Sequence, residues 1–287
     1  GSSASDRTYY KRYAYTYGYA NNVVSESVSS SSTDVDERKS YSYDSLGQLI
    51  RFNDKDSYKT YIYEYDRAGN ITKKSEHIFT AASDVTSAPL EELTFGYAGV
   101  WGDRLVRVGS ETDNIIYDNA GNPTSYLGAS LVWRARQLMS YEKGSKKVAF
   151  SYDENGLRYS KNVYESNVLK ESYRYIWNDS RLSALKVKSF GVNNEVSILT
   201  SLYIYDDFGN LSGFALYGSE GLLGKYFYIK NLFGDITAIV NANGVVQATY
   251  AYDAWGALSL YMPEESSLSQ NELRLANTFG FRGYCYD

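Results

Sequence analysis

Six aspartates stand in the same local setting along this chain and are the first candidates for chemistry. Each follows a tyrosine and precedes a glycine by three residues, in a Tyr-Asp-x-x-Gly pentad. Two carboxylates at a fixed separation can act as general acid and base when one has a raised pKa. Clustered carboxylates can also bind calcium. The pentad residues are Tyr43, Asp44 and Gly47; Tyr65, Asp66 and Gly69; Tyr117, Asp118 and Gly121. They continue with Tyr152, Asp153 and Gly156; Tyr205, Asp206 and Gly209; Tyr252, Asp253 and Gly256.

Repetition argues against a catalytic pair, because six equivalent positions give no reason for any two to be special. An Asp at the start of a turn accepts hydrogen bonds from backbone N–H groups two residues on. A Gly three residues later suits the left-handed position of a hairpin turn with a bulge. We therefore interpret the pentads as hairpin turns in which Tyr packs, Asp caps and Gly turns.

The segments around the pentads alternate as strands do. Tyr13, Tyr15, Tyr17 and Tyr19 fall on every second residue, which places their rings on one face of a strand. Similar runs precede and follow each pentad. The pattern predicts an all-β fold, a spiralling antiparallel sheet of successive β-hairpins.

Other chemistry has little support in the sequence. His77 is the only histidine and Cys285 the only cysteine. We predict a surface role for His77 and a buried or half-buried strand position for Cys285. No Walker loop, dinucleotide fingerprint or Cys/His metal cluster is present, so neither a cofactor nor a metal is expected. Three formal glycosylation sequons fall at or near turns, where Asn is common.

Composition limits the choice of partners. The 287 residues include 31 tyrosines and carry a formal net charge of −5. This charge gives no electrostatic argument for nucleic acid. No apolar stretch is long enough for a membrane span.

The pentads, the Trp-x-x-Arg motifs that begin at Trp101 and Trp133, and the closing Phe-Arg-Gly-Tyr-Cys-Tyr-Asp run resemble the Rhs/YD-repeat family. The resemblance extends from about residue 9 to the end. It implies part of a hollow, non-enzymatic β-shell around a C-terminal toxin or effector cargo supplied in cis. Related proteins are the Tc-toxin cocoon proteins and the teneurins. It further implies a secreted or cell-surface protein of a bacterium. The sequence variant of the repeats resembles the form found in Gram-positive species.

The resemblance also suggests how the chain is organised. Residues 1–8 are interpreted as a tag or disordered start, and residues 9–287 as a single YD-repeat domain. That domain stops before the C-terminal core, the cleavage site and the toxin. No catalytic residue is assigned, although Arg282 and Asp287 correspond to positions near the family's self-cleavage machinery.

Two other functions remain open. Tyrosine ladders can stack on sugars, which favours an adhesion or carbohydrate-binding module with glycans as partners. The other is a remnant of an aspartyl-type autoproteolytic core. Open hairpin sheets also leave unpaired edges. We therefore expect either edge-to-edge self-association or coverage of the edges by the irregular residues 76–92 and 264–277, the latter with a short helix.

Overall fold

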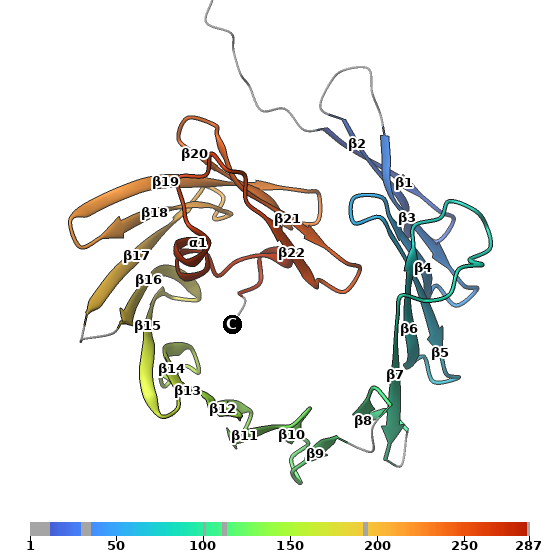
Figure 1. Cartoon of the computed structure of the whole chain (residues 1–287), viewed down its shortest axis with the longest axis horizontal. Helices are drawn as coiled ribbons and strands as arrows, with labels where there is room; N and C mark the ends of the chain where they lie inside the picture. The colour runs from blue at the N-terminus through green and yellow to red at the C-terminus, as the bar shows by residue number, and fades with distance from the viewer. Residues whose placement is uncertain (1–11, 30–35, 100–101, 111–113, 192–194, 286–287) are drawn as a thin grey trace, which may run out of the picture. The chain divides into compact units, whose positions relative to one another are not determined.

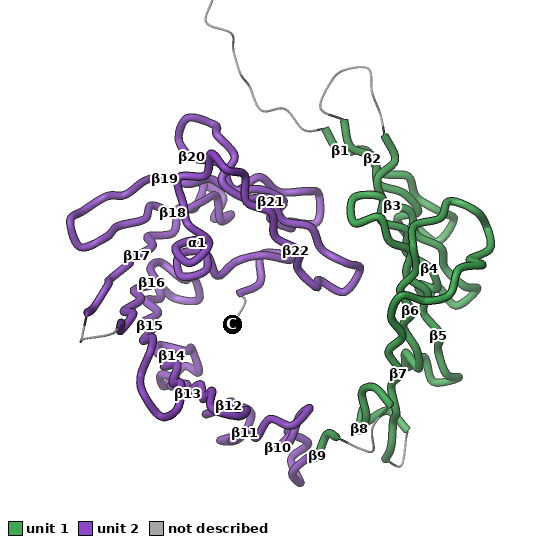
Figure 2. The backbone as a smooth tube through the Cα atoms, viewed as in Figure 1, with its two compact units in different colours: residues 1–116 green, residues 117–287 purple. Residues whose placement is uncertain are grey.

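The structure is a computed structural model that describes residues 12–29, 36–99, 102–110, 114–191 and 195–285. Within these ranges almost all regular structure is antiparallel strand, and the predicted all-β fold of successive hairpins is confirmed. Two compact units are present, residues 1–116 and 117–287 (Figure 2). The single domain expected over residues 9–287 stays a prediction. The tag expected over residues 1–8 lies outside the described residues.

The first unit contains an eight-stranded sheet in which every strand pairs with its neighbours in sequence. Its strands are β1 (Arg12–Tyr17), β2 (Val23–Ser29), β3 (Asp36–Tyr43), β4 (Leu49–Asp54), β5 (Lys59–Tyr65), β6 (Ile71–Ile78), β7 (Glu91–Ala98) and β8 (Arg104–Val108). Part of the predicted irregular segment 76–92 is therefore strand, since β6 and β7 extend into it. Stacked Tyr41, Phe52 and Tyr61 rings pack on one face.

The second sheet has fourteen strands, again in sequence order (Figure 1). Its first half is β9 (Ile115–Tyr117), β10 (Pro123–Tyr126), β11 (Ala129–Arg134), β12 (Gln137–Lys143), β13 (Lys146–Tyr152), β14 (Arg158–Glu165) and β15 (Val168–Asn178). Its second half is β16 (Arg181–Phe190), β17 (Val196–Tyr205), β18 (Leu211–Gly218), β19 (Gly221–Lys230), β20 (Ile236–Asn241), β21 (Val246–Tyr252) and β22 (Leu258–Tyr261).

Each pentad is the turn of a hairpin. In the turn after β17, Asp206 Oδ1 accepts the backbone N–H groups of Phe208 and Asn210 at 3.0 and 2.7 Å. Gly209 has φ +85°, a conformation that suits glycine, and an added Cβ there would lie 2.3 Å from Arg181 Nη2. The backbone conformation therefore favours glycine at this position, and the Arg181 side chain would have to move to admit any other residue.

An aromatic side chain ties most of these hairpins to the one before it. Tyr205 Oη donates to the Leu182 carbonyl at 2.9 Å, and Leu182 is near the start of the strand that follows the preceding turn. Trp177 Nε1 donates in the same way to the Arg158 carbonyl at 2.8 Å. We call this the stitch bond. Other stitch bonds are Tyr43 to Val23, Tyr65 to Leu49, Tyr97 to Ile71, Trp133 to Pro123, Tyr152 to Leu138 and Tyr252 to Ile236.

A β-bulge accompanies most stitch bonds. The strand register shifts between Ile204 and Tyr205, and again between Ile176 and Trp177. A bulge bends its strand and increases the local twist. Because these bulges recur at the same place in successive hairpins, their bends add along the sheet. In the second unit the sheet β15–β22 curves around the helix α1 (Gln270–Ala276), as Figure 1 shows.

The main hydrophobic core lies between this curved sheet and the end of the chain. We call residues 262–285 the C-terminal segment, and the face of β15–β21 that it packs on the inner face. Leu273, Leu275 and Ala276 of α1 are almost completely buried there. Ser269 and Glu272 form a capping box at the start of α1, which fixes where the helix begins. The short helix expected within residues 264–277 is therefore present.

We predict that Tyr205→Phe destabilises the second unit by about 1 kcal/mol, because it deletes the stitch bond and leaves the ring in place. Chemical denaturation of both proteins measures the difference in unfolding free energy. Tyr261→Phe is the matched control, since the Tyr261 side chain is 66% exposed and the change should be nearly neutral. Equal stabilities of all three proteins would contradict a structural role for the stitch bond.

Candidate functional site

The pentad aspartates are separate from one another, each at its own turn. In every pentad, Asp Oδ1 accepts two backbone N–H groups of the same turn. The acceptors are Asp44, Asp66, Asp118, Asp153, Asp206 and Asp253. Side-chain hydrogen bonds from Asn70, Asn122 and Asn210 lower the pKa of the aspartates of their turns. A general acid needs the opposite shift.

The other sequence candidates that the structure describes do not come together either. Arg282 has a guanidinium 5.3 Å from the Phe281 ring centroid, and its backbone N–H donates to Asp235. Asp287 lies outside the described residues. His77 is buried on β6, where its ring contacts Ser75 and the Ser87 carbonyl, so the predicted surface position was wrong. Cys285 is exposed, so the predicted buried or half-buried position was wrong. Among the described residues, no group of three His, Cys, Asp or Glu could hold a metal ion.

A tyrosine-lined anchor holds the C-terminal segment against the inner face. Asn277 lies at its centre, because its Oδ1 accepts from Tyr228 Oη at 2.7 Å and its Nδ2 donates to Tyr250 Oη at 3.1 Å. Tyr203 Oη donates to the Ala276 carbonyl, and the Phe279 ring packs edge-on to Tyr203 at 4.9 Å. Helix α1 and three strands of the sheet are fixed together in this way.

The anchoring tyrosines remain protonated over the ordinary pH range. Burial raises the pKa of Tyr203 and Tyr228 well above the usual value, and raises that of Tyr250 to about 12. These hydroxyls therefore stay neutral hydrogen-bonding groups. The alternation of tyrosines predicted ladders, but no sequence pattern indicated that the C-terminal segment packs on them.

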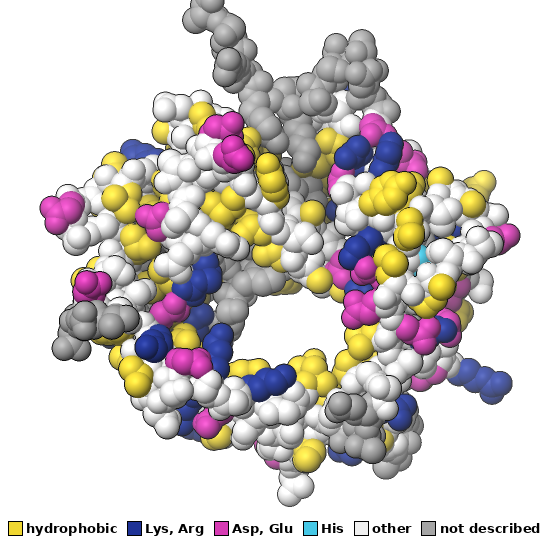
Figure 3. All heavy atoms as spheres, viewed as in Figure 1, with side chains coloured by type: hydrophobic (Ala, Val, Ile, Leu, Met, Phe, Trp, Pro, Cys, Tyr) yellow, Lys and Arg dark blue, Asp and Glu magenta, His cyan; other side chains and the backbone are white. Residues whose placement is uncertain are grey.

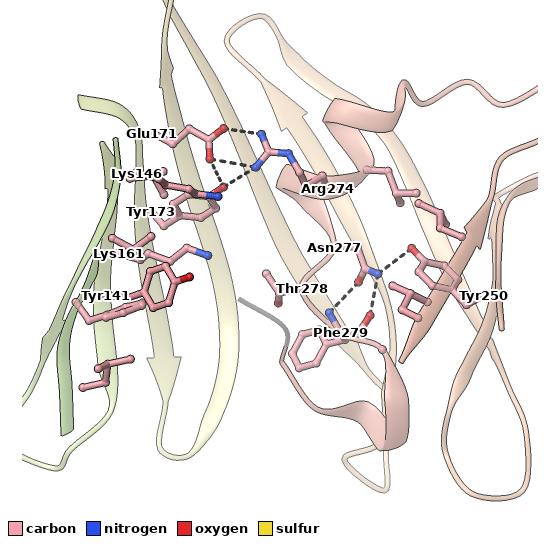
Figure 4. A pocket seen from close by; sticks show the side chains of 18 residues that line it. Tyr141, Lys146, Lys161, Glu171, Tyr173, Tyr250, Arg274, Asn277, Thr278 and Phe279 are labelled. Atoms are coloured by element: carbon pink, nitrogen blue, oxygen red, sulfur yellow. Dashed lines mark hydrogen bonds and ion pairs between the residues drawn. The ribbon is translucent and has the colours of Figure 1, made fainter. Parts of the chain in front are cut away.

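Beside the anchor lies a cavity of about 660 Å³, lined by one side of β12–β15, by β21 and β22, and by the C-terminal segment. Figure 4 shows the side chains that surround it. The apolar part of the wall includes Leu138, Val148, Phe150, Val163, Leu258, Leu260 and Leu273. A volume between 300 and 1,000 Å³ with a mostly apolar wall is typical of ligand sites.

Charged groups meet at one end of the cavity. The Arg274 guanidinium contacts both carboxylate oxygens of Glu171, and Tyr173 Oη donates to Glu171 Oε2 at 2.6 Å. Lys161 is 7% exposed, and its ammonium lies 4.2 Å from the Tyr173 ring centroid. Lys146 lines the same cavity. The cavity wall therefore holds three cations, two of which, Arg274 and Lys161, act on the Glu171 carboxylate.

Sequence reasoning missed this cluster. The capping box at Ser269 and Glu272 was a visible signal for α1, and it places Arg274 on the helix. No sequence signal connects Arg274 to Glu171, which is 103 residues away. Lys161 and Glu171 resemble any charged residue of an exposed strand face until the C-terminal segment covers them.

Comparisons with known proteins place this architecture. No family model matches the chain. It is 32% identical over 189 residues to the tRNA3(Ser)-specific nuclease WapA of Bacillus spizizenii, and 31% identical over 189 residues to the tRNA nuclease WapA of Bacillus subtilis. Each alignment covers 64% of this chain and 7% of the relative. The chain thus spans about 7% of the length of these curated relatives.

Solved structures of the same fold are TcdB2-TccC3 and the TcdB2-TccC3-Cdc42 complex. In each, the match covers 96% of this chain and 15% of the other, with 17% identity and a TM-score of 0.73. The chain is similar to the Rhs/YD-repeat proteins. This YD-repeat chain is a structural module of the Rhs type. No helix among its described residues is long and apolar enough to cross a membrane.

We predict that the Glu171–Arg274 contact stabilises the second unit at neutral pH and is lost in acid. Burial opposes ionisation of Glu171, but the hydrogen bonds from Arg274 and Tyr173 outweigh it and lower its pKa below the usual 4.5. A lowered folded-state pKa gives stability that is complete above pH 4.5 and disappears as the pH falls through the lowered value.

Glu171→Gln should therefore cost about 1 kcal/mol at neutral pH and progressively less in acid. Denaturation of both proteins over a pH series measures this difference. Glu142→Gln is the control, because Glu142 is 55% exposed beside Lys147 on the surface. A Glu171→Gln effect that stays constant with pH would exclude the ionised carboxylate as its source.

Proposed function

We propose that this chain forms part of a hollow β-shell that encloses a C-terminal toxin or effector domain of its own polypeptide. The observation that carries the proposal is the buried inner face of the second unit. There a curved sheet of hairpins receives the chain's own C-terminal segment on its concave side (Figure 1). Polypeptide that follows residue 285 would then begin inside the curve rather than outside it.

The role we propose is non-enzymatic. The pentad carboxylates are used for backbone capping, and the buried tyrosines are used for packing and for holding the C-terminal segment. A wall of this kind isolates a cargo by excluding solvent and other proteins, which needs no reacting group. The fold shared with TcdB2-TccC3 supports this role.

The curated relatives support a division of labour within a longer protein. Their names assign them tRNA nuclease activity, yet this chain corresponds to about 7% of their length. We infer that any such activity in the parent protein resides in another region, and that this YD-repeat region surrounds it. The Bacillus relatives also support a secreted or cell-surface protein of a Gram-positive bacterium.

One observation favours a second candidate, glycan binding. The turns after β17, β19 and β21 lie at the same end of the sheet and present Phe208, Phe233 and Trp255, which are 90%, 42% and 55% exposed. Alternate strands of a sheet are about 10 Å apart, which would set the three rings in a row along this end of the sheet. Exposed aromatic rings in a row can stack on successive sugars.

The shell is tested with the parent protein, that is, this chain together with the polypeptide that follows it. Limited trypsin digestion should leave the downstream polypeptide intact while the second unit is folded. Phe214→Asp places a charge at a fully buried core position and should expose the downstream polypeptide to the protease. The control Tyr261→Ala, at an exposed position, should keep the protection. Equal digestion of wild type and Phe214→Asp would contradict enclosure.

Glycan binding is tested separately on an array with this chain alone. If the row of rings binds sugars, wild type should give signals that fall at least tenfold in Trp255→Ala and Phe208→Ala, since each substitution removes a stacking surface. Tyr261→Ala should retain the signals. An array without wild-type signals would exclude the second candidate and leave the shell untouched.

A further inference from the structure

Strand β22 ends the larger sheet with one free edge. It pairs with β21 through the register Tyr250 to Leu260 and Tyr252 to Leu258. In the part of the chain that the structure describes, no strand pairs with its other edge. A free edge presents backbone N–H and C=O groups that can pair with another extended chain.

The free edge borders the cavity described above. Leu258 and Leu260 are two residues apart on one face of β22, and both line the cavity. They are 42% and 39% exposed, so the floor beside the edge is open. A strand added to β22 would turn every second side chain toward this cavity, because side chains alternate between faces.

The opposite wall of the cavity is positively charged. Lys161 reaches into it from β14, opposite Thr278 and Phe279, and Lys146 lies nearby (Figure 4). Glu171 is bound by Arg274 and is one carboxylate among three cations. In Figure 3, Lys and Arg side chains are also visible over the strands around β13–β16. An incoming group with a negative charge is therefore favoured.

We propose that the free edge of β22 and this cavity bind an extended peptide segment by strand addition. Main-chain hydrogen bonds to β22 would supply affinity, and side chains in the cavity would supply selectivity. The segment has apolar residues at alternate positions and an acidic residue on the same face, placed to meet Lys161.

A second copy of this chain fits less well than such a peptide. The sequence of β22 is Leu-Ser-Leu-Tyr, which contains no acidic residue. Edge pairing of two β22 strands would therefore bring no acidic side chain to the cavity. Charge complementarity therefore selects a segment of different composition.

The inference does not depend on the proposed shell, because the test uses a free peptide. If the peptide binds but the downstream polypeptide is not protected from trypsin, only the shell fails. If protection is seen without peptide binding, only this inference fails.

The probe is a fluorescein-labelled peptide, acetyl-Thr-Leu-Thr-Asp-Thr-Leu-Thr-amide, titrated with this chain and followed by fluorescence anisotropy. Leu and Asp share one face of this peptide when it is extended. A peptide of the same composition with Asp moved to the Thr face should bind at least tenfold more weakly, because its charge would miss the cavity.

Two N-methylated versions separate strand addition from simple pocket binding. One is methylated at the Leu and Asp nitrogens and the other at the Thr nitrogens. Alternate N–H groups of a strand point to opposite edges, so only one of the two should lose binding. Equal binding of both versions, or displacement of the peptide by dodecanoate with no effect of methylation, would overturn strand addition.

A charge exchange tests the cationic wall. Lys161→Glu should weaken the Asp peptide at least tenfold and strengthen the same peptide with Lys in place of Asp. Lys146 is exposed, so Lys146→Glu is the second variant if Lys161→Glu does not fold. Thermal unfolding identifies a misfolded variant. Unchanged selectivity in the folded variants, or a chain that dimerises through β22 and excludes the peptide, would contradict the proposal.

Discussion

The stitch bond is the interaction on which the rest of this molecule depends. A hairpin closed by a Tyr-Asp-x-x-Gly turn pairs with the hairpin before it through a strand ladder, as β17 pairs with β16, and that ladder alone permits a range of angles between the two. The tyrosine at the bulge, or the tryptophan in its place, reaches back to one backbone carbonyl and fixes that angle. Repeated over successive hairpins, a bond of about 1 kcal/mol acts together with the bulges that bend the sheet.

The curvature gives the sheet of the second unit a concave inner face, and the C-terminal segment packs on that face. A flat sheet would offer the C-terminal segment one surface, whereas the curved one offers side chains from several strands around α1. The buried hydroxyls of Tyr203 and Tyr228 meet backbone and amide partners of that segment. Burying these groups without partners would cost stability, so the segment and the tyrosines require one another.

Local features were predictable from the sequence, but contacts between residues far apart in the sequence were not. The alternation of tyrosines predicted the strands, and the chemistry of Asp and Gly predicted the turns, because both depend on neighbours in sequence. The Trp-x-x-Arg motif was visible, but only the structure gives Trp133 the same role as Tyr152. His77 was placed on the surface because its segment is polar, whereas β6 buries it beside two serines. The cluster of Lys161, Glu171 and Arg274 forms only because the C-terminal segment folds back onto the sheet. No local sequence pattern predicts that path.

The stitch bonds all run in one direction along the chain, and this direction matches the order in which the hairpins are synthesised. Each aromatic donor needs a carbonyl from the hairpin made before it, and none in the series described needs the hairpin made after it. A ribosome produces the hairpins in that same order. Every new hairpin can therefore join a sheet edge that is already in place, and the C-terminal segment reaches a surface that is complete when it emerges.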